Sequence, residues 1–246
     1  TTRIGRSSLP PGPGSGGSVT SPMTAPTMIS AAKEAQRKLL GKLAEHAGGK
    51  ADDYTIRAGE VFKGDQRVMS WMEGCQKLPN DGVMGSADGG EGGKGHSNGA
   101  QFVKVIVDTE TGVIRVDHVI AIQACGRVIC RKTAESQIIG GVIQGLSYAL
   151  FENKILDRNT GAMVNDNFEW YKILGPADMP HIEPVLWTKG EQTGVKALGE
   201  PPTIPTAGAA ACALFNAIGR PVRDLPLTPD KVLAALEQPL EQGAGA

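Results

Sequence analysis

The sequence predicts an α+β fold in which mixed and antiparallel sheets pack against helices. Two observations lead to this prediction. The chain contains both β-branched runs arranged as hairpins and amphipathic segments with helical spacing, and these segments follow one another without strict βαβ alternation. The chain has 246 residues, of which 40% are hydrophobic, so it is long enough to bury a sizeable core.

Residue periodicity predicts the first elements. Apolar residues at helical spacing predict a helix over 25–47, which a pair of glycines ends. Weak alternation predicts a short hairpin over 54–62, and a short helix is expected over 68–76. A glycine-rich connection over 79–99 follows.

The second half of the chain contains the clearest strand signals. Two β-branched runs, 100–107 and 113–124, flank a segment of turn-forming residues and predict an antiparallel hairpin. The elements expected after this hairpin are a helix over 133–152, a turn at 157–161, strands near 168–174 and 182–187, and helices over 206–218 and 228–236.

Composition excludes several classes of function. A net charge of -1 without Lys or Arg blocks gives no electrostatic surface for nucleic acid, and no apolar run approaches the roughly 18 residues of a membrane helix. The four cysteines form no C-x-x-C pair and the four histidines no H-E-x-x-H motif. We therefore expect free thiols, no metal held by protein ligands, no nucleic acid and no membrane span.

Three sites have the residue types of a ligand-binding or catalytic centre. Gly14 to Thr20 combines small residues, the hydroxyls of Ser18 and Thr20, and a following helix, which suits a phosphate, although a plain flexible loop has the same composition. Gln137 and Gln144 lie on nearly the same face of one predicted helix, where their amides need partners in the core or in a ligand. Glu200 lies in a small-residue loop, where desolvation would suit a general base, while capping the next helix is the structural alternative.

These segments resemble one family in both content and order. The three motifs and the ending of the chain look like those of the molybdenum hydroxylases (the xanthine dehydrogenase/aldehyde oxidase family), in the C-terminal, molybdopterin-binding part of the large subunit. The matching segments are Pro10 to Ser18, Thr133 to Gly145, Lys196 to Pro202 and Leu225 to Val232.

The resemblance implies roles for individual residues. Glu200 would be the base beside molybdenum, and Gln137 would contact the pterin cofactor. The residues that would hold the cofactor phosphate are Gly17, Ser18, Val19 and Thr20. The first motif is most similar to the bacterial aldehyde-oxidising branch, which implies the cytosine dinucleotide form of the molybdenum cofactor.

The resemblance also implies an activity that needs partners. It indicates a molybdenum-containing oxidoreductase that oxidises an aldehyde or an aromatic N-heterocycle with water-derived oxygen. Residues 1–240 would form one structural unit with a flexible tail at 241–246. The upstream motifs of the large subunit are absent, so we expect another chain to carry them, with iron–sulfur clusters and FAD on further subunits. We expect a cytoplasmic location, or a periplasmic one if a partner carries the export signal.

Some features depart from the family or leave alternatives open. Cys130-Arg131 replaces an Asn-Pro pair that is common before the long helix, which puts the geometry of this loop in doubt. Thr1 could serve as an N-terminal nucleophile of a hydrolase if maturation exposes it. The chain could also be a cofactor-holding scaffold without chemistry of its own, although the Gly199-Glu200 motif argues against this.

Overall fold

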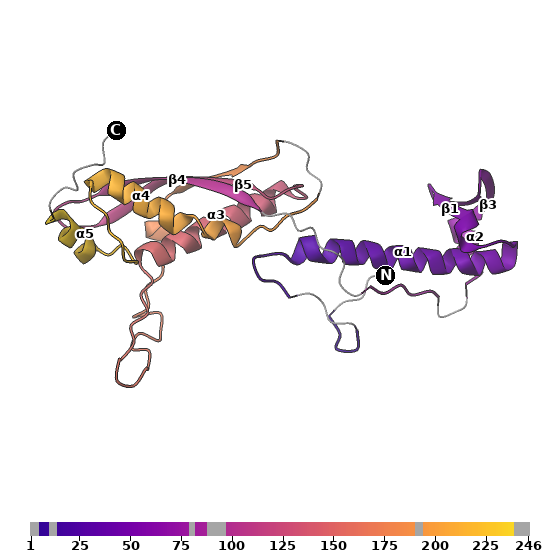
Figure 1. The fold of residues 1–246 in the computed structure, drawn as a ribbon, viewed down its shortest axis with the longest axis horizontal. Helices are drawn as coiled ribbons and strands as arrows, with labels where there is room; N and C mark the ends of the chain where they lie inside the picture. The colour runs from indigo at the N-terminus through magenta and orange to yellow at the C-terminus, as the bar shows by residue number, and fades with distance from the viewer. Residues whose placement is uncertain (1–4, 10–13, 79–81, 88–96, 190–193, 239–246) are drawn as a thin grey trace. The chain divides into compact units, whose positions relative to one another are not determined.

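The computed structural model describes residues 5–9, 14–78, 82–87, 97–189 and 194–238. The chain divides into two compact units, which are drawn in Figure 1. Unit 1 comprises residues 1–14 and 20–94, and unit 2 comprises 15–19 and 95–246. The prediction that residues 1–240 act as one structural unit once another chain completes them stays a prediction.

Unit 1 is built around one long helix and a small antiparallel sheet. The helix is α1 (Thr20–Ala47), and the sheet has the order β1-β2-β3. The other elements of this unit are β1 (Tyr54–Arg57), β2 (Glu60–Lys63), β3 (Gln66–Ser70), the one-turn helix η1 (Ala51–Asp53) and α2 (Trp71–Gln76). Leu39, Leu43 and Val61 are almost fully buried between helix and sheet, so the apolar stripe of α1 forms this core.

Unit 2 contains a three-stranded mixed sheet of order β4-β5-β6. The strands are β4 (Asn98–Val107), β5 (Ile114–Ala124) and β6 (His181–Leu186). β4 pairs antiparallel with β5, while β5 pairs in parallel with β6. The predicted hairpin and the predicted strand near 182–187 are therefore confirmed.

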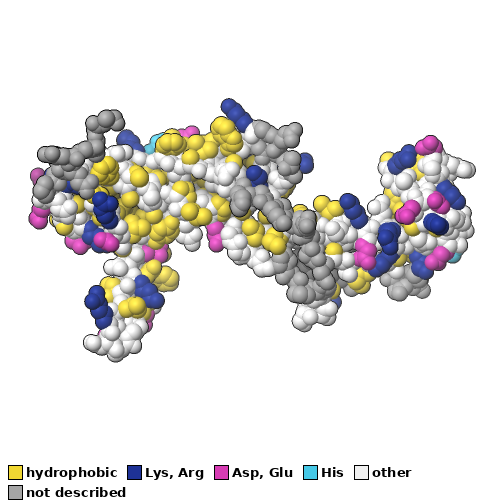
Figure 2. All heavy atoms as spheres, viewed as in Figure 1, with side chains coloured by type: hydrophobic (Ala, Val, Ile, Leu, Met, Phe, Trp, Pro, Cys, Tyr) yellow, Lys and Arg dark blue, Asp and Glu magenta, His cyan; other side chains and the backbone are white. Residues whose placement is uncertain are grey.

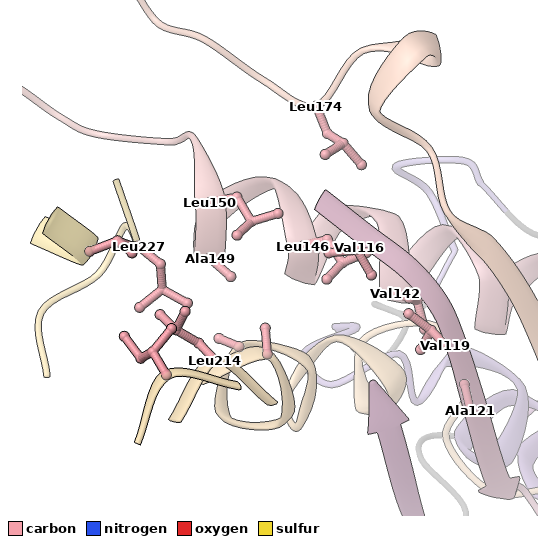
Figure 3. Packing of buried hydrophobic residues seen from close by; sticks show 14 of the residues in the cluster. Val116, Val119, Ala121, Val142, Leu146, Ala149, Leu150, Leu174, Leu214 and Leu227 are labelled. Carbon is pink, nitrogen blue, oxygen red and sulfur yellow. The ribbon is translucent and has the colours of Figure 1, made fainter. Parts of the chain in front are cut away.

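Helices cover one face of this sheet and form the larger core. They are α3 (Arg131–Leu150), α4 (Thr206–Ile218) and α5 (Pro229–Leu236). Figure 3 shows Val142 and Leu146 of α3 packed toward Val119 of β5, with Leu214 of α4 and Leu227 nearby. Val119, Val142 and Leu146 are fully buried, so α3 is fixed on the sheet along its length.

Two short loop helices complete unit 2, and both begin with proline. They are η2 (Pro176–Asp178) and η3 (Pro201–Thr203). Proline suits the first position of a helix because its missing N–H has no partner there. The second of these helices directly follows Glu200 and so fixes where that residue lies.

Three expectations for elements were wrong. Residues 167–171 form a turn instead of a strand, because Asn167 accepts the amide of Tyr171 at 2.8 Å and its side chain accepts that of Glu169 at 3.1 Å. The segment 66–70 is strand β3, and helix α2 starts only at Trp71, where the Ser70 hydroxyl caps it. Helix α3 begins at Arg131, two residues before the expected start.

An arm formed by residues 152–173 projects from unit 2 below α3 (Figure 1). Asn165 is buried at its base, where it accepts the amide of Ile155 at 2.9 Å and donates to the carbonyl of Asn153 at 2.6 Å. Phe168 and Trp170 are 83% and 71% exposed. The arm is therefore an anchored structure that presents apolar side chains to its surroundings.

Candidate functional site

Three of the predicted site residues converge on one glycine in unit 2. Ser18 comes from the loop 15–19, Gln137 from α3, and Glu200 from the turn before η3. A Cβ on Gly199 would lie 2.8 Å from the Ser18 Oγ and 3.0 Å from the Gln137 Oε1. Gly199 also has φ +126°, a conformation that residues with a side chain rarely adopt. Glycine is therefore required where these three segments meet.

Ser18 and Glu200 form two reciprocal hydrogen bonds. The Ser18 hydroxyl donates to the Glu200 Oε2 at 3.0 Å, and the Glu200 amide donates to the Ser18 Oγ at 3.0 Å. The hydroxyl thus uses its oxygen as an acceptor and its hydrogen as a donor toward the same residue. This pairing fixes the carboxylate relative to its own backbone.

The loop before α1 has an unusual, glycine-rich backbone. Gly17 and Ser18 both have positive φ angles, +77° and +61°, and Gly14 and Gly16 have open space where a side chain would be. Helix α1 begins at Thr20, five residues before the predicted start. Positive φ angles at two successive residues make this a tight turn that leaves room beside its backbone. The phosphate role of Gly17, Ser18, Val19 and Thr20 stays a prediction.

The turn that carries Glu200 is held by hydrogen bonds from β4, α3 and α4. The Gln101 side chain of β4 donates to the carbonyl of Pro202 at 2.5 Å and accepts the hydroxyl of Thr206 at 2.8 Å. Tyr148 of α3 donates to the carbonyl of Thr203 at 2.9 Å. Thr206 is fully buried, so these contacts are protected from water.

A stripe of glycines lets α3 approach this turn closely. A Cβ on Gly141 would lie 2.8 Å from the Gly199 carbonyl oxygen, and one on Gly145 would lie 2.5 Å from the Thr206 Cβ. Gly140, in contrast, would place its Cβ in open space. The i, i+4 pair of glycines thus allows a backbone contact that a side chain would prevent.

Two expectations about the surroundings of these residues were wrong. Glu200 is exposed, so the carboxylate is not desolvated by the described residues. Its side chain makes no capping hydrogen bond to η3 either, which removes the structural alternative of a helix cap. Gln137 and Gln144 are exposed, so the described core does not supply the partners that their amides were expected to find there. Gln144 instead accepts the hydroxyl of Thr203 at 3.5 Å.

The residues that hold the turn were missed in the sequence. Gln101, Tyr148 and Thr206 lie outside the motifs, and their hydrogen bonds join positions up to 105 residues apart. The repeated glycines of α3 were the one available signal, since a glycine inside a helix costs stability unless packing needs it.

Several predicted features lie outside the described residues or away from this site. Thr1, the segment 10–13 and the tail 241–246 are outside the described part of the chain. Within the described ranges, no three His, Cys, Asp or Glu side chains form a metal-binding group, and no helix is long and apolar enough to cross a membrane. A surface groove of about 530 Å³, lined by Ile29 and Trp71 among others, lies in unit 1 and contains none of the predicted site residues.

Known proteins similar to this chain include a molybdenum-binding subunit and the large subunit of a hydroxylase. The chain is 36% identical over 139 residues to the aldehyde oxidoreductase molybdenum-binding subunit PaoC of Escherichia coli strain K12. The matched segment covers 55% of this chain and 19% of that protein. It is 34% identical over 148 residues to the nicotine 6-hydroxylase large subunit of Paenarthrobacter nicotinovorans, which covers 56% of this chain and 18% of that subunit. The chain therefore spans about a fifth of the length of these relatives.

Solved structures and a family model agree with these relatives. The fold matches quinoline 2-oxidoreductase from Pseudomonas putida 86 with a TM-score of 0.65 and 23% identity, over 84% of this chain and 28% of that one. The family model for a molybdopterin cofactor-binding domain matches residues 5–180, which include the loop at Ser18 and the helix of Gln137. The chain belongs to the molybdopterin cofactor-binding domain family.

Proposed function

We propose that this chain is the C-terminal part of the molybdenum-binding subunit of a hydroxylase, and that Glu200 is its catalytic base. The observation that carries this proposal is the meeting of Ser18, Gln137 and Glu200 around Gly199. Three segments separated by more than 50 residues each place a polar side chain at one exposed position. The printed names of the relatives, an aldehyde oxidoreductase and a nicotine 6-hydroxylase, support an aldehyde or an aromatic N-heterocycle as substrate.

The residues present fit a molybdenum cofactor with a phosphate-bearing tail. Gly17 and Ser18 have positive φ angles, and a Cβ at Gly14 or Gly16 would meet no atom within 4 Å, so this loop leaves room for a ligand. Gly17, Ser18, Val19 and Thr20 would hold the phosphate, and the exposed Gln137 amide would contact the pterin. Cytosine dinucleotide is the form that we propose for the tail.

Glu200 supplies the acid–base chemistry in this proposal. When bound, the cofactor supplies a metal centre that takes up the two electrons of the oxidation. The ionised Glu200 carboxylate accepts a proton from the water-derived oxygen that enters the substrate. The hydrogen bond from Ser18 occupies Oε2, so Oε1 is the oxygen left available to take this proton.

The remaining parts of the enzyme would come from other polypeptide segments. The chain spans 28% of the quinoline 2-oxidoreductase chain, and the upstream part of the molybdenum subunit would complete the site. The arm 152–173 is a surface on which that part could dock: Figure 2 shows hydrophobic side chains on it, and Phe168 and Trp170 are almost fully exposed. Electrons would leave through iron–sulfur and FAD subunits.

Replacing the proposed base tests this function. The complex of this chain with its partner subunits is prepared as wild type and as the variants Glu200→Gln and Glu110→Gln. Glu110→Gln is the matched control, because Glu110 lies at the exposed turn of the β4–β5 hairpin. Glu200→Gln should keep its molybdenum content and lose about two to four orders of magnitude in the rate of cofactor reduction by benzaldehyde or quinoline. The Glu110→Gln complex should react as wild type does. Reduction of Glu200→Gln near the wild-type rate would remove Glu200 from the mechanism.

The form of the cofactor and the location are separate proposals. Acid release of the nucleotide from the purified complex should yield cytidine monophosphate in a one-to-one ratio with molybdenum. Release of guanosine monophosphate, or of no nucleotide, would reject the cytosine form. We place the complex in the cytoplasm, or in the periplasm if a partner subunit carries the export signal, and fractionation of cells with an antibody to this chain tests that.

A further inference from the structure

We propose that Ser18 is a positioning residue whose hydroxyl orients the Glu200 carboxylate. This inference rests on the proposed role of Glu200 as base, and it gives Ser18 a second task beside the phosphate loop. The same residue would then connect binding of the cofactor tail with the readiness of the base. The argument starts from the two hydrogen bonds between these residues.

The direction of the Ser18 hydroxyl is determined by the geometry. Its oxygen accepts the Glu200 amide at 3.0 Å, so its hydrogen is free for the Glu200 Oε2, which lies 3.0 Å away. A hydroxyl that donates to a carboxylate stabilises the charged form of that group. The Glu200 side chain is otherwise exposed and would sample many rotamers, so this bond also restricts where the carboxylate points.

The backbone of Ser18 indicates that its position is constrained. A φ of +61° is uncommon for a residue other than glycine and costs stability, so the surrounding structure must favour it. Gly199 lies on the other side of the contact with φ +126°, and its missing side chain leaves the room that the Ser18 Oγ occupies. Two unusual backbone conformations thus bring one hydroxyl to one carboxylate.

The elements packed against the Glu200 turn present neutral groups to it. These groups are Gln137, Gln144 and Tyr148 of α3, Gln101 of β4 and Thr206 of α4. Tyr148 is the one that can ionise, and burial raises its pKa above the ordinary value, so it stays neutral at working pH. Ser18 therefore supplies the hydrogen bond that reaches the Glu200 carboxylate itself.

Infrared spectroscopy of the Glu200 carboxylate tests this role without relying on activity. The complex is prepared with Ser18→Gly, which removes the hydroxyl and relieves the backbone, and with Ser18→Ala, which removes the hydroxyl alone. Ser18→Asn supplies another donor in a residue that tolerates positive φ. Ser15→Gly is the matched control, since Ser15 is exposed in the same loop. The difference between each spectrum and that of its Glu200→Gln counterpart isolates the Glu200 band.

Loss of the donor should change the hydrogen bonding of the Glu200 carboxylate. The carboxylate stretching bands of Glu200 should shift in frequency in both Ser18→Gly and Ser18→Ala, return partly in Ser18→Asn, and stay in place in Ser15→Gly. The rate of cofactor reduction with benzaldehyde or quinoline should fall in the two variants without a donor and recover partly in Ser18→Asn. Bands that are unmoved in both Ser18→Gly and Ser18→Ala would overturn the proposal.

The infrared measurement keeps this proposal separate from the proposed function. It needs no bound molybdenum, so a variant that loses cofactor still reports whether the hydroxyl controls the carboxylate. If Glu200→Gln reacts at the wild-type rate while Ser18→Gly shifts the band, the base role fails and the contact remains. If Glu200→Gln is inactive and the band does not shift, Glu200 is the base and Ser18 serves the loop alone.

Discussion

Replacing Gly141 with alanine should push α3 away from the turn that carries Glu200. The new Cβ would lie 2.8 Å from the Gly199 carbonyl oxygen and 2.9 Å from the Pro202 Cβ. Carbon and oxygen atoms in close protein contacts are about 3.3 to 3.6 Å apart, so helix and turn must separate by roughly half an ångström. The backbone oxygen cannot rotate away as a side chain could. Glu200, next in the chain, should therefore move with Gly199.

The neighbouring glycine provides the control for this change. Gly140 lies on the same helix with open space around its Cβ position. Alanine at either position gains up to about 1 kcal/mol of helix propensity. Overpacking at Gly141 costs about 1 to 3 kcal/mol, which Gly140 avoids. Because the propensity terms cancel, the free energy of unfolding should differ between the two variants by this overpacking cost alone.

Thermal and chemical unfolding of the assembled complex measure this difference. For a chain of this size, 1 kcal/mol corresponds to about 2 to 4 °C in Tm, so the Gly141→Ala complex should melt several degrees below Gly140→Ala. Hydrogen exchange should be faster in the segment 196–206 of Gly141→Ala only. Equal melting temperatures and equal exchange in the two variants would show that the close contact between α3 and the turn does not form.

The other predictions concern single contacts. Gln137→Leu should lower molybdenum content with little change in Tm, because the amide is exposed, and metal analysis beside calorimetry checks this. Tyr148→Phe removes the donor to the Thr203 carbonyl and should lower the free energy of unfolding by about 0.5 to 1.5 kcal/mol in denaturant titrations. Hydrogen bonds from Thr133 lower the pKa of the Cys130 thiol. Alkylation of Cys130 by iodoacetamide should therefore reach its half-maximal rate at a lower pH than alkylation of an ordinary thiol does, and Thr133→Val should raise that pH.

Local signals in the sequence predicted most of the elements. Helix α4 begins and ends where the pattern predicts it, since Thr206 starts an alanine-rich run and Gly219 takes the left-handed conformation after Ile218. The β4–β5 hairpin was equally clear because two β-branched runs flank one turn. These features depend on residues close together in the chain, so the sequence contains the information needed to predict them.

Features that depend on tertiary contacts were harder to predict. The strand expected near 168–174 had the right residue types, yet Asn167 closes a local turn there and the strand does not form. Motifs identified Ser18, Gln137 and Glu200, but their spacing gave no indication that Ser18 would donate to Glu200 across 182 positions. Such a contact follows from the packing of α3 and η3, which no local pattern describes.

The exposure of Glu200 indicates what the rest of the molybdenum subunit must provide. A general base works best where water is excluded, because competing water weakens its contact with the reacting atoms. The described residues orient the carboxylate through Ser18 and the turn through Gln101 and Tyr148, but they leave the carboxylate open. In our proposal, cofactor and upstream segments therefore cover a base whose direction this chain has already fixed.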